Sequence, residues 1–137
     1  TDYQRSNLKP LLENQIEYNN NISKKMIATQ KYWNNMEDKL SGSEVVIVSY
    51  GIRGKNALKE LLLRKINVVA ICDNNENFRY QNVGVPMFST EEVTKKYRDA
   101  MYVIANKKYS DVLEKQLILL GIPKINIILD TFDKIRS

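Results

Sequence analysis

The sequence predicts an α/β fold with a parallel sheet, preceded by a helical arm. Short, fully apolar runs at residues 45–48 and 68–72 alternate with segments whose apolar residues recur at helical spacing. This pattern is typical of strands buried on both faces and of the helices that connect them. The first 42 residues differ, because they are rich in Asn, Lys and Gln and contain no strand-like run. We therefore divide the chain into a helical arm, residues 1–42, and an α/β domain, residues 43–137.

Composition limits the class of protein. A chain of 137 residues that is 43% hydrophobic suits one core. The net charge is +5, but the basic residues are scattered in separate pairs rather than gathered in a stripe, so we expect no nucleic-acid partner. No apolar run approaches the roughly 18 residues of a membrane span, so we expect no membrane span. One cysteine and no secretory signal lead us to expect a cytoplasmic setting.

Catalytic signatures are missing from the sequence. Histidine is absent, which removes imidazole bases, histidine-containing triads and the usual zinc ligand sets. No Tyr-x-x-x-Lys dyad occurs, and no carboxylate pair has a spacing that demands acid–base chemistry. We expect no catalytic residue, no metal site and no independent turnover by this chain.

The arm carries a stripe of positions spaced alternately by four and three residues. Its members are Leu8, Leu12, Gln15, Asn19, Ile22, Met26, Thr29, Trp33, Met36 and Leu40. The polar members, together with an expected interruption at residues 19–21, predict two helices rather than one, with Pro10 in the first turn of the first. The stripe has two interpretations. It packs on the chain's own α/β domain, or residues 8–40 bind a protein partner or a second copy.

The α/β domain reads as five strands separated by helices. Strands are predicted at 45–48, 68–72, 87–88, 102–105 and 125–129, and helices after Gly54, from Ser89 or Thr90 to Lys96, and over 110–120. Right-handed crossovers make 3-2-1-4-5 the natural strand order. The predicted fold is therefore a Rossmann-like, doubly wound parallel sheet of five strands with an N-terminal helical extension.

A glycine motif follows the first predicted strand and opens a helix. The segment 49–54 reads Ser49-x-Gly51-Ile52-Arg53-Gly54, with Lys55 next. Gly51 would let the backbone approach a phosphate, and Gly54 would let the helix pack on the strand. The N–H groups of the first helical turn, that of Ile52 included, would face the anion. Arg53 and Lys55 would add positive charge nearby. Alternatively, both glycines serve only the turn and the packing. Ser49 stands where the dinucleotide pattern has its first glycine.

Two further loops complete the predicted site. Asp73, with Asn74 after it, ends the second strand about 20 residues beyond the glycines, where an acid accepts hydrogen bonds from a ribose. The alternative is a polar loop in which Asp73 bonds its own backbone. The strand order also places the loop 106–110 opposite Gly51, so Asn106 and Lys107 would meet a second phosphate or a sugar acid.

These segments together resemble a known bacterial module. They are the strand at 45–49, Gly51-x-x-Gly54, residues 70–74, Val83-Gly84-Val85-Pro86, residues 89–92 and 119–122. They resemble the small Rossmann-like domain of polysaccharide biosynthesis proteins, found N-terminal in sugar acyltransferases and beside methyltransferase or glycosyltransferase domains. The resemblance covers residues 44–129 and implies nucleotide or nucleotide-sugar binding, with Gly51 and Gly54 bordering the phosphates and Asp73 the ribose or base. Ser49 departs from the family pattern.

The sequence leaves the ligand open. The expected partner is a phosphate-bearing small molecule, with a nucleotide-sugar, an NAD-type dinucleotide and acyl-CoA as the candidates. The first hypothesis is an accessory binding domain or subunit of a sugar-modifying transferase. The others are an NAD-binding oxidoreductase or redox-sensing fragment, and a scaffold protein acting through its helical arm.

Overall fold

The computed structural model describes residues 2–78 and 83–133, with side chains from Leu12 onward. These residues form two compact units, one comprising 2–34 with 132–133 and the other comprising the described part of 35–131. In the first unit the rings of Tyr32, Trp33 and Phe132 pack together, with centroids 5.0 to 6.1 Å apart. The second unit is the α/β domain together with the last turns of the preceding helix.

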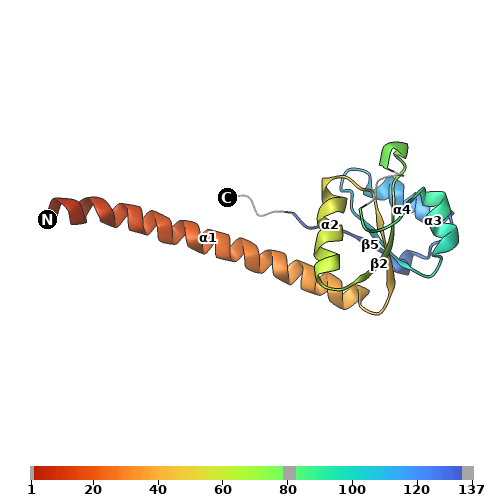
Figure 1. Ribbon diagram of the computed structural model, residues 1–137, viewed down its shortest axis with the longest axis horizontal. Helices are drawn as coiled ribbons and strands as arrows, with labels where there is room; N and C mark the ends of the chain where they lie inside the picture. Colours follow the sequence, from red (N-terminus) through yellow and green to blue (C-terminus); the bar gives the residue numbers. More distant parts are fainter. Residues whose placement is uncertain (1, 79–82, 134–137) are drawn as a thin grey trace. The chain divides into compact units, whose positions relative to one another are not determined.

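The arm is one continuous helix, α1 (Asp2–Leu40), and the prediction of two helices is wrong (Figure 1). Asn lowers helix stability by only about 0.7 kcal/mol per residue relative to Ala, so residues 19–21 weaken a helix without ending it. Gln15 Nε2 also donates a hydrogen bond of 3.1 Å to Asn19 Oδ1 one turn later. Pro10 lies beyond the first turn, contrary to expectation, because the helix already begins at Asp2. Gly42, at φ 82°, takes the left-handed conformation that follows many helix ends.

The sheet has the predicted strand order. Its parallel strands are β1 (Glu44–Val48), β2 (Asn67–Cys72), β3 (Met87–Phe88), β4 (Met101–Ile104) and β5 (Ile127–Leu129), arranged β3-β2-β1-β4-β5. Val48 lies opposite both Cys72 and Ile104, so the three central strands end at the same level. β5 is shorter than predicted, because residues after Pro123 first form the 3₁₀ turn η2 (Lys124–Asn126).

Helices cover both faces of the sheet. α2 (Ile52–Leu63) lies on one face, and α3 (Thr90–Lys96) and α4 (Ser110–Leu119) lie on the other (Figure 1). Alternate residues of β1 point to opposite faces, and all four from Val45 to Val48 are at most 1% exposed. This is why the strand reads as an unbroken apolar run.

Ser89 caps α3 as predicted. The backbone N–H of Glu92 donates to Ser89 Oγ at 3.2 Å, and this hydroxyl donates to the Glu92 carboxylate at 3.1 Å. The short 3₁₀ turn η1 (Glu76–Phe78) follows β2. Among the helices of the described residues, none combines the length and the apolar character needed to cross a membrane.

Candidate ligand-binding site

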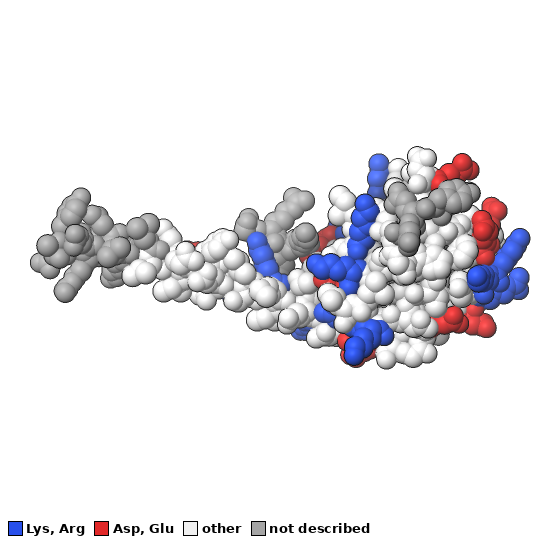
Figure 2. Space-filling view, in the orientation of Figure 1, with Lys and Arg blue, Asp and Glu red and all other residues white. Residues whose placement is uncertain are grey.

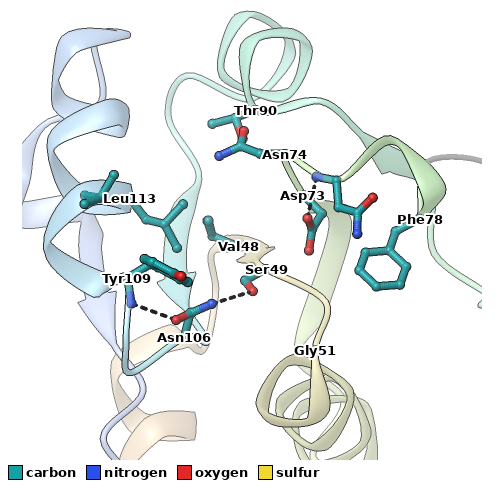
Figure 3. Close-up of a pocket in the computed structure, with 12 residues that line it drawn as sticks. Val48, Ser49, Gly51, Asp73, Asn74, Phe78, Thr90, Asn106, Tyr109 and Leu113 are labelled. Carbon is teal, nitrogen blue, oxygen red and sulfur yellow. Dashed lines mark hydrogen bonds between the residues drawn. The ribbon is translucent and has the colours of Figure 1, made fainter.

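A cavity of about 460 Å³ opens at the carboxyl edge of the sheet, where β1, β2 and β4 end (Figure 3). It is lined by Val48, Ser49, Gly51, Asp73, Asn74, Asn75, Phe78, Thr90, Asn106, Tyr109, Val112 and Leu113. The volume lies in the range of small-molecule sites, and the position is the topological switch point at which open α/β sheets bind ligands. Five residues predicted for the site line it: Ser49, Gly51, Asp73, Asn74 and Asn106.

The loops after β1 and β4 meet across this cavity, as the strand order predicts. Asn106 Nδ2 donates a hydrogen bond of 3.2 Å to Ser49 Oγ, and Asn106 Oδ1 accepts one of 2.9 Å from the backbone N–H of Tyr109 (Figure 3). Ser49 has φ 81°, a left-handed conformation that costs most residues about 1–2 kcal/mol. Ser49 thus adopts the backbone shape that explains a glycine at this place in the dinucleotide pattern.

Asp73 holds two backbone segments. Its Oδ2 accepts a 2.7 Å hydrogen bond from the N–H of Tyr50, in the turn before α2, and its Oδ1 accepts a 2.7 Å bond from the N–H of Asn75. The structural interpretation of Asp73 as a loop residue is therefore correct. It does not displace the ligand interpretation, because Asp73 also lines the cavity and each carboxylate oxygen retains a second lone pair.

The two glycines of the motif have different surroundings. A Cβ on Gly54 would overlap the carbonyl oxygen of Ser49, so close packing of α2 on the β1 loop requires glycine there. Gly51 has φ −81° and an extended conformation that any residue adopts, and a Cβ there would meet nothing within 4 Å. Packing explains Gly54, whereas neither packing nor backbone shape explains Gly51.

α2 begins beside the cavity without a side-chain cap. Gly51 is its N-cap residue and supplies no side-chain hydrogen bond to the first turn. The first N–H groups of a helix lack acceptors within the helix and carry the positive end of its dipole. Such an end attracts an anion.

The other five predicted residues lie outside the cavity lining. Arg53 Nη1 donates to the backbone carbonyl and the carboxylate of Asp130, the residue after β5, at 3.3 and 3.5 Å. Lys55 Nζ lies 5.5 Å from the ring centroid of Tyr50, and the Ile52 side chain is 90% exposed. Gly54 is buried, and Lys107 is an exposed residue of the β4–α4 loop.

Charge around the cavity is accordingly sparse. Among the described residues that line it, Asp73 is the one charged side chain, and none is Lys or Arg. On the face of the α/β unit drawn in Figure 2, basic and acidic side chains are interspersed rather than gathered by sign. An anionic group in this cavity would therefore depend on backbone N–H groups more than on cations.

Sequence reasoning missed three lining residues of note: Phe78, Thr90 and Tyr109. Thr90 follows β3, so applying the carboxyl-edge rule to the third strand would have found it. Tyr109 lies in the loop 106–110 that was expected to face the cavity. Phe78 lies in η1, where no spacing rule marks it, and its ring packs edge-on against Tyr50 with centroids 6.1 Å apart.

Cys72 lies just below the cavity and is fully buried. Burial raises the pKa of its thiol to about 12, with the neighbouring Asp73 charge acting in the same direction and a hydrogen bond with Thr90 acting against it. The thiol is thus neutral at physiological pH and a poor nucleophile.

Neither a scan of protein-family models nor a search of curated proteins finds a match to this chain. Function is therefore inferred from the fold, the geometry of the cavity and the sequence resemblance.

Proposed function

We propose that this chain is a cytoplasmic binding domain for a nucleotide or nucleotide-sugar, held by its phosphates at the first turn of α2. In this proposal it serves a sugar-modifying transferase in bacterial polysaccharide biosynthesis and does not catalyse alone. The observation that carries the proposal is the contrast between Gly51 and Gly54. Gly54 is needed by the chain itself, whereas Gly51 leaves open space at an uncapped helix end beside a cavity.

The phosphate end of the ligand is assigned to α2. Glycine at position 51 supplies no side-chain cap to the first-turn N–H groups and leaves open space where a Cβ would be, so these groups can take a ligand as their acceptor. Since no cation lines the described cavity, these groups are the strongest attraction that it offers to an anion.

The nucleoside end is assigned to the β2 side of the cavity. Asp73 repels anions but accepts hydrogen bonds from hydroxyl groups, and its second lone pairs suit a ribose. Phe78 supplies an aromatic surface near it (Figure 3). Asn75, another lining residue, supplies an amide. A group with hydroxyls and a flat base fits this set better than a second phosphate does.

The sugar part of the proposal comes from the sequence resemblance, and an NAD-type dinucleotide would use the same geometry. Thermal shift with UDP-glucose, dTDP-glucose, CDP-ribitol, NAD, NADH and acetyl-CoA separates these ligands. A ligand present at 100 times its dissociation constant stabilises the fold by about 2.7 kcal/mol. We expect a nucleotide-sugar to raise the melting temperature. A shift with NAD or NADH alone would favour an oxidoreductase or redox sensor instead.

The variant Gly51→Asp tests the site itself. Asp is a good N-cap residue, so the free protein should be as stable as the original or more so, while the added charge repels the phosphate. The control Leu63→Asp adds the same charge at the other, exposed end of α2. Loss of the ligand shift in Gly51→Asp alone supports the proposal. An equal shift in both variants, or no shift with any compound, contradicts it.

A further inference from the structure

α1 exposes large apolar side chains along most of its described length. Leu12, Met26 and Ile27 are 62%, 58% and 64% exposed, and Ile22 is 38% exposed. The last three members of the same stripe are buried, so the stripe changes from covered to open between Trp33 and Met26. On the face drawn in Figure 2, the described part of α1 carries few charged groups.

An uncovered helix of this composition is not expected to persist. Every side chain from Leu12 to Lys24 is exposed, and this stretch contains four asparagines. Helices in water take most of their stability from packing of an apolar face, and Asn disfavours the helix interior. Since α1 continues unbroken through residues 19–21, its stripe requires a covering partner.

The stripe has the register of a coiled coil. Over residues 12–29 the a positions are Leu12, Asn19 and Met26, and the d positions are Gln15, Ile22 and Thr29. The f positions of this range, which point away from such a seam, are Glu17 and Lys24. Positions g and e flank the seam and contact each other between the two helices of a parallel pair. Lys25, at g, would face Gln30, at e, of the other helix, so this contact brings no like charges together.

The polar seam positions select the partner. Thr29 Oγ1 already donates to the carbonyl of Lys25 at 2.9 Å. An entirely apolar partner would, however, bury the Gln15 side-chain carbonyl and the Asn19 NH₂ group without partners, which is costly. A second copy in the same register places each of them against itself, and amide and hydroxyl groups both donate and accept. Asn19 Oδ1 already accepts from Gln15, while the Asn19 NH₂ group carries donors for the partner. A single Asn at an a position specifies register and favours two strands.

We propose that residues 12–29 of α1 form a parallel, in-register, two-stranded coiled coil with a second copy of this chain. The pairing covers Leu12, Ile22 and Met26 and aligns Asn19 with Asn19 of the second copy. It is independent of the ligand proposed for the α/β cavity.

Sedimentation equilibrium of the full chain, from micromolar to millimolar concentration, tests the association. We expect a particle with twice the mass of one chain, lost in Ile22→Asp and retained in Ile27→Asp. The two changes are chemically identical, but Ile22 is a d residue and Ile27 a b residue off the seam. If the exposed apolar area alone decided the association, Ile27→Asp would weaken the dimer more than Ile22→Asp, because Ile27 is the more exposed of the two. A monomer at every concentration, or equal loss in both variants, overturns the proposal.

Disulfide cross-linking tests the orientation. Ile22→Cys should form a covalent dimer on mild oxidation, because parallel register places the two d residues side by side, whereas Ile27→Cys should not. Cys72, the sole natural cysteine, is buried and does not interfere. A dimer that persists without cross-linking through Ile22→Cys overturns the parallel arrangement.

Discussion

The hydroxyl oxygen of Ser49 accepts a hydrogen bond of 3.2 Å from the side-chain amide of Asn106, and this bond joins the loops that follow β1 and β4. Both loops border the cavity at the switch point of the sheet. Ser49 makes this contact from a left-handed backbone conformation, at φ 81°. Strained residues of this kind concentrate at binding sites, where the surrounding structure holds them.

Two substitutions at Ser49 separate the strain from the hydrogen bond. Ser49→Ala and Ser49→Gly both remove the acceptor, but only glycine relieves the left-handed strain. We expect Ser49→Ala to lower the free energy of unfolding by about 1 kcal/mol and Ser49→Gly to be about 1 kcal/mol more stable than Ser49→Ala. Urea unfolding curves measure both values. Equal stability of the two variants would show that the backbone here is not strained.

The glycines of the motif should respond differently to alanine. Gly54→Ala forces a Cβ into the Ser49 carbonyl, so we expect a loss of about 2 kcal/mol or more. Gly51→Ala places its Cβ in open space, so we expect a loss of at most about 0.5–1 kcal/mol, because Ala is a poorer N-cap residue than Gly but lowers the entropy of the unfolded chain. Thermal unfolding of the two variants without ligand checks this contrast. A large loss in Gly51→Ala would mean that the chain itself needs Gly51, which removes the main support for the phosphate site.

The α/β part was predictable because its physical constraints are local. Strands buried on both faces must be apolar at every position, so the run from Val45 to Val48 identifies a strand without knowledge of its neighbours. The crossover rule then leaves one natural order for five strands. The continuity of α1 was not predictable in this way, because three Asn residues shift the helix equilibrium by an amount that a neighbouring turn or a partner outweighs.

The candidate site was predicted in part for a similar reason. Ser49 and Asp73 directly follow a strand and Asn106 lies two residues after one, so the strand order alone brings them to one edge. Arg53 has no such constraint. It lies one residue past the helix start, and its side chain meets Asp130, which is remote in sequence and carries no local signal.

The ion pair of Arg53 and Asp130 should stabilise the fold of the α/β domain. Asp130 is 4% exposed, and its carboxylate lies 3.5 Å from Arg53 NH1. Arg53→Met leaves a buried charge without this counter-charge, so we expect a loss on the order of 2 kcal/mol, less than in a fully buried pair because Arg53 is partly exposed. Adding Asp130→Asn should recover part of this loss, as a double-mutant cycle in urea would show. Additive losses would indicate no coupling between the two side chains.

Cys72 should make the stability of the domain depend on alkaline pH. Its folded pKa is raised from the ordinary 9.0 to about 12 by burial, so its contribution is fully present below pH 9 and is lost as the pH rises towards 12. Lysines and tyrosines also titrate there, so the comparison is with Cys72→Ala, which lacks only the thiol. Between about pH 8 and about pH 10.5 we expect the original chain to lose about 2 kcal/mol more than the variant. If the free energy of unfolding, measured in urea, fell equally with pH in the original chain and in Cys72→Ala, the thiol would ionise as readily in the folded protein as in the unfolded one.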